Sequence, residues 1–71
     1  METNIIEIDI DALQISLLDG SVWMLAKAGD ISKVSIWYPP QRIEIEESNG
    51  EFFLCNLDTY GQEKIQVLRI M

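Results

Sequence analysis

The sequence predicts a single small all-β domain over residues 1–71, and three observations lead to this fold class. Eleven isoleucines and three valines stand against three alanines, and β-branched side chains suit the pleated surface of a sheet. Apolar and polar residues alternate with a period of two along several short segments, as they do in strands with one buried face. Turn residues separate these segments at short intervals, which is typical of small sandwiches and barrels.

Two strands and a returning strand are expected in the first third of the chain. Apolar residues take every second position over two stretches, which are Ile6, Ile8 and Ile10, and then Leu13, Ile15 and Leu17. Asp19-Gly20 then indicates a tight hairpin, because a primed turn needs positive φ at its central residues, and residues 21–26 return as a strand. A short helix within residues 9–18 is the alternative, since Asp11 can open a capping box there.

The middle of the chain fits two interpretations. In the first, Asp30 caps a short helix within residues 30–37. In the second, which we prefer, a turn leads into a strand from about Lys33. Val34 falls on an apolar face in either case. Pro39-Pro40 ends the element, because the residue before a proline is pushed towards extended geometry.

The second half of the chain reads as three strands separated by two turns. Residues 42–47 alternate between polar and apolar side chains, and Ser48-Asn49-Gly50 indicates a hairpin from which residues 51–56 return. Asp58-Thr59-Tyr60-Gly61 makes the next turn, and residues 63–70 form the last strand.

Five or six short strands joined as a meander predict a small, partly open antiparallel barrel of the SH3-like type. Closing a sheet hides strand edges that would otherwise pair with other chains. An OB-like barrel is the alternative, although that fold normally carries a helix between strands.

The order of several short motifs resembles that of short uncharacterised bacterial proteins. The shared pattern, within residues 13–70, consists of Asp19-Gly20-Ser21-x-Trp23, Asp30, Trp37-x-Pro39, Ile43-x-Ile45 and Leu54-x-Asn56-x-Asp58. The resemblance implies a small β-barrel and carries no activity with it. The chain departs from the pattern at Pro39-Pro40-Gln41, where a turn similar to Pro-Gly-Asp would be expected.

Composition excludes several classes of function. Five basic residues face twelve acidic ones, for a net charge of −7, and a phosphate backbone is attracted only by clustered Lys and Arg. The basic residues are instead scattered singly, as Lys27, Lys33, Arg42, Lys64 and Arg69. We therefore expect no nucleic-acid partner.

No catalytic, cofactor-binding or metal-binding residues are predicted. The chain has no histidine, which removes the usual general base near neutral pH, the commonest transition-metal ligand and any Ser-His or Cys-His pair. Its four glycines are isolated at turns, so that no phosphate-binding loop is present. The carboxylates of Asp9 and Asp11, and those of Glu44, Glu46 and Glu47, are interpreted as solvated strand faces rather than as an ion site or an acid–base pair.

Cys55 is expected to be an inert filler of the core, because it ends the apolar run Phe52-Phe53-Leu54-Cys55. One cysteine allows no internal disulfide. The first residues lack the pattern of a secretory signal, and no apolar run approaches the ~20 residues of a membrane-spanning helix. We therefore expect a cytoplasmic protein without a membrane partner.

The aromatic residues are the strongest candidates for contact with a partner. There are six of them, more than so small a core is expected to hold: Trp23, Trp37, Tyr38, Phe52, Phe53 and Tyr60. Because Trp37 and Tyr38 are adjacent on an extended segment, their side chains should point in opposite directions. We select Trp37, Tyr38, Tyr60 and Trp23 as partner-binding residues. In the alternative, Trp23 and Trp37 anchor the core and the two tyrosines cover loops.

These observations favour a protein-interaction or self-associating module without catalytic activity. It would bind another protein or a second copy of itself through exposed aromatic residues and a free strand edge. An acidic mimic of nucleic acid that inhibits a DNA-binding protein is the alternative, and it rests on the net charge alone. A carboxylate-based enzyme is the third hypothesis.

Overall fold

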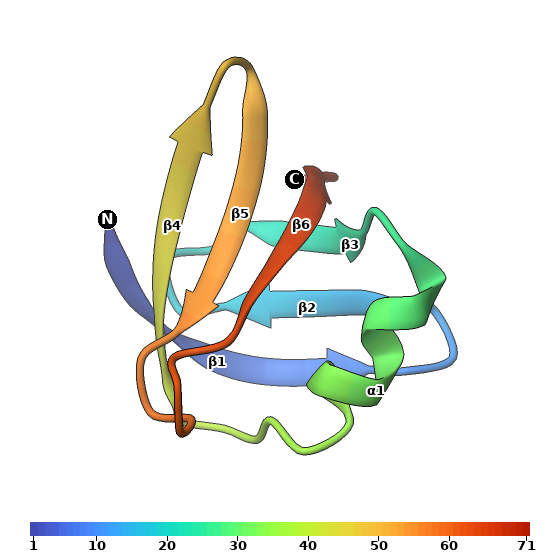
Figure 1. The fold of residues 1–71 in the computed structure, drawn as a ribbon, viewed down its shortest axis with the longest axis vertical. Coiled ribbons are helices and arrows are strands. Elements are labelled where there is room, and N and C mark those ends of the chain that lie inside the picture. Colours follow the sequence, from blue (N-terminus) through green and yellow to red (C-terminus); the bar gives the residue numbers. More distant parts are fainter.

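Six antiparallel strands close into a barrel in the computed structural model, which describes all residues from 1 to 71 (Figure 1). In chain order the elements are β1 (Glu2–Asp9), β2 (Gln14–Leu17), β3 (Val22–Leu25), a 3-10 turn (Ala28–Asp30), α1 (Ile31–Val34), β4 (Arg42–Ser48), β5 (Glu51–Asn56) and β6 (Lys64–Arg69). The predicted small all-β barrel is confirmed, and it is closed.

The barrel consists of two three-stranded meanders rather than a single one. Strands β1, β2 and β3 pair consecutively, as do β4, β5 and β6. The connection after β3 crosses the end of the barrel, so that β4 pairs with β1 and β6 pairs with β3. A continuous meander was the expectation from turn spacing, and the α1 crossover is the reason that it does not form.

A β-bulge in β1 corrects the prediction that Ile6, Ile8 and Ile10 share one face. Ile5 pairs with Leu17, whereas Glu7 pairs with the preceding residue of β2, so that Ile6 is an additional residue in β1. A bulge reverses the alternation of side chains beyond it. Ile5 is accordingly 1% exposed and Ile6 52% exposed.

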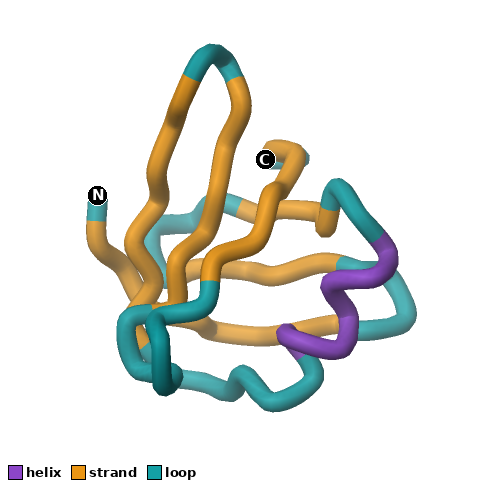
Figure 2. The backbone as a smooth tube through the Cα atoms, in the orientation of Figure 1, coloured by secondary structure: helices purple, strands orange, loops and turns teal.

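No helix forms within residues 9–18, where the chain makes a turn from β1 into β2. The strand predicted from Lys33 is wrong, and the alternative of a short helix within residues 30–37 is the one that forms, because the segment is helical over Ala28–Asp30 and Ile31–Val34 (Figure 2). Two side chains three residues apart, Val34 and Trp37, are both buried. A turn with helical spacing can bury both, whereas a strand would point them to opposite faces.

Eleven buried side chains fill the barrel: Ile5, Ile15, Leu17, Trp23, Leu25, Val34, Trp37, Ile43, Leu54, Ile65 and Val67. Trp23 has no exposed surface, and its ring centroid lies 5.1 Å from that of Phe52. The guanidinium carbon of Arg69 lies 5.3 Å from the centre of the same ring. The interior is thus organised around Trp23.

The Asp-Gly-Ser-x-Trp motif is a structural device that orients this tryptophan. Asp19 accepts hydrogen bonds from the backbone N–H of Ser21 at 3.0 Å and from its hydroxyl at 2.6 Å, while Gly20 between them has φ +93°. The Ser21 hydroxyl oxygen in turn accepts from Nε1 of Trp23 at 2.8 Å. Partial burial acts to raise the pKa of Asp19, but the hydrogen bonds from Ser21 outweigh it, so that the pKa lies below its ordinary value.

Candidate partner-binding groove

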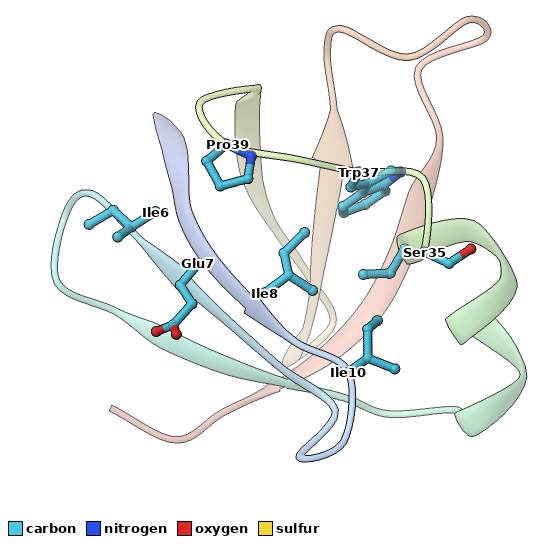
Figure 3. A pocket seen from close by; sticks show the side chains of 8 residues that line it. Ile6, Glu7, Ile8, Ile10, Ser35, Trp37 and Pro39 are labelled. Atoms are coloured by element: carbon cyan, nitrogen blue, oxygen red, sulfur yellow. The ribbon is translucent and has the colours of Figure 1, made fainter.

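One cavity of about 390 Å³ lies between the second half of β1 and the segment that follows α1 (Figure 3). Five of its eight lining residues are hydrophobic, and the complete lining is Ile6, Glu7, Ile8, Ile10, Val34, Ser35, Trp37 and Pro39. We call this cavity the β1 groove. It is the one hollow of the surface large enough to take part of another molecule.

The groove exists because β1 loses a neighbour halfway along its length. On one side, β1 pairs with β2 as far as Asp9. On the other side, it pairs with β4 only over Glu2–Asn4, and the last contact there is the bond from the N–H of Ile5 to the carbonyl of Gln41, at 2.9 Å. Beyond Ile5 this edge of β1 has no strand partner.

The backbone of Ile8 points towards this free edge. The N–H of Leu17 donates to Ser21 on the β3 side, and backbone groups of successive residues in a strand point to opposite edges. Ser16 therefore faces β1, and so its partner Glu7 faces β2. Ile8, the next residue along β1, directs its N–H and C=O away from β2, into the groove.

The side chains divide between the floor and the rim of the groove. Ile8 and Ile10 point into the space between β1 and α1, with Trp37 above them, whereas Ile6 and Glu7 point to the other side of the strand (Figure 3). Ile6 and Ile10 are exposed large apolar residues. The apolar surface that Ile6 and Ile10 offer to solvent thus comes from the β1 side of the groove, whereas Val34 and Trp37 of the opposite wall are buried.

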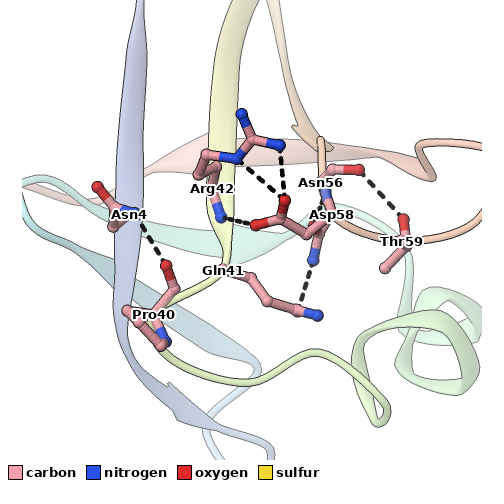
Figure 4. Close-up of polar contacts among 7 residues, drawn as sticks. All are labelled: Asn4, Pro40, Gln41, Arg42, Asn56, Asp58 and Thr59. Atoms are coloured by element: carbon pink, nitrogen blue, oxygen red, sulfur yellow. Dashed lines mark hydrogen bonds and ion pairs between the residues drawn. The ribbon is translucent and has the colours of Figure 1, made fainter.

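Buried hydrogen bonds hold the wall opposite β1 in place (Figure 4). Asn56 is 0% exposed, and its Nδ2 donates to Oε1 of Gln41 at 2.8 Å. The same Gln41 oxygen accepts from the backbone N–H of Tyr38 at 3.0 Å. Oδ1 of Asn56 accepts from the N–H of Asp58 at 2.9 Å. Asn56 therefore ties the segment after α1 to the end of β5.

A second set of contacts holds the same segment at its end. Oδ1 of Asp58 accepts from Nε of Arg42 at 2.9 Å and from Nη2 at 2.8 Å, and its Oδ2 accepts from the backbone N–H of Arg42 at 2.8 Å. The side-chain hydrogen bond from Arg42 holds the pKa of Asp58 below its ordinary value. Nδ2 of Asn4 donates to the carbonyl of Pro40 at 2.8 Å. The Asn-x-Asp motif thus fixes the groove wall to the end of β5 through the hydrogen bonds of Asn56 and Asp58, which we call the latch.

The four aromatic residues selected from the sequence lie in three different places. Trp23 is in the core and does not reach the groove. Trp37 is 4% exposed and lines the groove, and Tyr38 beside it is 61% exposed, so that the two side chains differ as expected for adjacent positions. Tyr60 is fully exposed in the turn between β5 and β6, away from the groove lining.

The groove residues that sequence reasoning missed are the isoleucines of β1. Ile6, Ile8 and Ile10 were assigned to a buried strand face by their alternation, which the bulge interrupts. The signal available in the sequence is the Ile5-Ile6 doublet, because two successive apolar residues break a period of two.

Three carboxylates near the groove have no ion-pair partner. The ion pairs of the molecule are Lys33 with Asp30, Arg42 with Asp58, Lys64 with Glu46, and the amino group of Met1 with Glu44. Glu7, Asp9 and Asp11, on β1 and in the turn after it, take part in none of them. No group of three or more Cys, Asp or Glu side chains is arranged to hold a metal ion.

Cys55 is 7% exposed and is buried among the apolar residues, as predicted, although it is not a member of the cluster of eleven side chains that fills the barrel. It pairs with Glu44 on one side and Lys64 on the other, and its Sγ donates to the carbonyl of Gln62 at 3.4 Å. Burial, followed by the charge of Glu46, raises the pKa of the thiol. The group is therefore protonated and shielded near neutral pH.

No protein-family model, curated protein or solved structure matches the chain. Neither helical segment is long and apolar enough to cross a bilayer.

Proposed function

We propose that this protein is a protein-interaction module without catalytic activity, and that it binds its partner in the β1 groove. A single observation carries the proposal: an apolar groove lies along the second half of β1, where the edge that faces away from β2 has no strand partner. A free edge offers backbone donors and acceptors to another chain, and neighbouring apolar pockets take its side chains.

Several features support a binding role over a catalytic one. The groove contains one ionisable side chain, Glu7, and lacks a second group with which it could share acid–base chemistry. The Cys55 thiol is shielded and has a raised pKa. The cytoplasm is the setting that we propose, because the only cysteine is free.

Binding of another protein is favoured over mimicry of nucleic acid. A mimic would need a regular double row of free carboxylates, whereas Asp30, Glu46 and Asp58 are each paired with a basic side chain. An acidic mimic of nucleic acid would also have no use for an apolar groove.

The test compares two double variants that remove equivalent apolar surface. Ile6→Ser with Ile10→Ser alters the groove, whose residues are 52% and 37% exposed. Leu68→Ser with Ile70→Ser alters residues that are 55% and 42% exposed, at the end of β6 and outside the groove. Each tagged protein is used to capture partners from a lysate of the source cells, and its oligomeric state is measured by sedimentation at micromolar concentration.

We expect the wild type and the β6 variant to retain the same partner and the groove variant to lose it, while all three unfold at similar temperatures. The proposal is wrong if the groove variant captures the same proteins as the wild type, or if the wild type remains monomeric and captures none.

A further inference from the structure

We infer that the β1 groove binds an extended segment in which basic and apolar residues alternate, and that this segment adds to the free edge of β1 as a seventh strand. The inference rests on the proposed function and names the chemistry of the partner. Two observations specify it: the backbone orientation at Ile8 and the unpaired carboxylates of the same strand.

Backbone geometry places the added strand. Ile8 directs its N–H and C=O towards the free edge, whereas Glu7 and Asp9 direct theirs towards β2. An incoming strand therefore forms its main-chain hydrogen bonds with Ile8. Side chains directly opposite each other in paired strands lie on the same face of the sheet.

Side-chain geometry then specifies the alternation. The residue opposite Ile8 shares the face of that side chain and enters the groove, so that an apolar side chain is required there. The residues opposite Glu7 and Asp9 lie on the other face, next to carboxylates that have no ion-pair partner. Opposite charges across a strand pair stabilise it and like charges destabilise it, which favours Lys or Arg at both positions.

Net charge also distinguishes a basic partner from a second copy. The chain carries −7, so that a second copy would add repulsion at an edge that is already acidic, whereas a basic segment is attracted to it from a distance. The hydrogen bonds of Asn56 and Gln41 hold the opposite wall before the segment arrives. A preformed wall lowers the entropy lost on binding.

Four capped synthetic peptides of about seven residues probe the groove of the intact protein. The first alternates lysine with valine, the second has the same composition with the lysines in one block, and the third alternates glutamate with valine. The fourth is the first peptide with its central amide N-methylated, which prevents main-chain pairing. Binding is measured by calorimetry and by tryptophan fluorescence, to which Trp23 in the core and Trp37 in the groove both contribute, in about 50 mM and about 300 mM salt.

We expect the alternating lysine peptide to bind at least tenfold more tightly than each of the other three peptides. Higher salt should weaken this binding, because the contributing charges are at the surface. Equal binding of the blocked or the N-methylated peptide would refute strand addition, and equal binding of the glutamate peptide would refute the requirement for basic residues.

A pair of variants separates the local carboxylates from the total charge. Glu7→Gln with Asp9→Asn removes two charges beside the groove, and Asn retains the Oδ1 acceptor for the N–H of Ala12, 3.1 Å away. Glu47→Gln with Glu51→Gln removes two charges at the tip of the β4–β5 hairpin, far from α1 (Figure 1). The first variant should bind the alternating lysine peptide about tenfold more weakly than the wild type, and the second less than threefold more weakly.

Equal weakening by the two variants would overturn the inference. If none of the peptides binds, but Ile6→Ser with Ile10→Ser still abolishes capture of the partner, the partner chemistry is wrong and the proposed function stands. If that variant captures the partner normally, the proposed function fails as well.

Discussion

Replacing Asn56 with alanine should remove a large fraction of this protein's free energy of unfolding. The Asn56 side chain is fully buried and makes two hydrogen bonds, to Oε1 of Gln41 at 2.8 Å and from the N–H of Asp58 at 2.9 Å. Each bond contributes about 1 kcal/mol net. The Gln41 oxygen keeps the hydrogen bond from the N–H of Tyr38, and Asp58 is an exposed residue, so that water can replace the lost partner of its amide. The loss of the two hydrogen bonds therefore amounts to about 2 kcal/mol.

That loss is large because the whole domain has 71 residues, for which a total free energy of unfolding of about 4–10 kcal/mol is expected. Urea unfolding followed by tryptophan fluorescence measures the difference, since Trp23 and Trp37 are both buried in the folded state. The transition should remain a single step with an unchanged slope and a lower midpoint.

Two further variants control for this interpretation. Gln66→Ala removes an exposed amide that donates to Glu51 at 2.9 Å and should change stability by less than about 0.5 kcal/mol. Asn56→Asp retains the acceptor for Asp58, but it places an oxygen against Oε1 of Gln41 and buries a charge, so that it should be at least as damaging as alanine. A stability of Asn56→Ala within about 0.5 kcal/mol of the wild type would refute the latch.

Two further predictions concern ionisable groups. Cys55 should react with a thiol reagent much more slowly in the native protein than in urea, because burial raises its pKa; equal rates would show that the thiol is open. For Asp58, whose pKa Arg42 lowers, the stabilisation is complete above about pH 4 and is lost as the pH falls through the lowered pKa. Asp58→Asn should therefore lose less stability than the wild type between about pH 5 and pH 3 in urea titrations, and an equal loss would contradict the contact.

The second half of the barrel follows its local sequence closely. The alternation over residues 42–47 predicts β4, and Asn49-Gly50 predicts the turn, where φ is +54° and +82°. The predicted return over residues 51–56 is β5. Alternation and left-handed turn positions are properties of a few neighbouring residues, which is why they could be recognised without the fold.

The groove could not be recognised in this way, because each of its parts depends on distant residues. The bulge at Ile6 is a matter of register against β2. The helical turn that ends at Val34 was predicted as a strand, and only burial of Val34 together with Trp37 decides between the two. The sequence could not decide which aromatic side chains are exposed either. Trp23 has no exposed surface, whereas Tyr60 is fully exposed.

The amino-acid sequence by itself determined that this chain forms short antiparallel strands around an apolar interior, without histidine chemistry and under a strongly acidic surface. Tertiary structure alone decided the closed strand order, the place where β1 loses its neighbour and the wall that faces its free edge. The physical reason is one of range. Side-chain alternation and turn geometry act over a few residues, whereas closure and register are selected by the packing of residues that lie far apart in the chain.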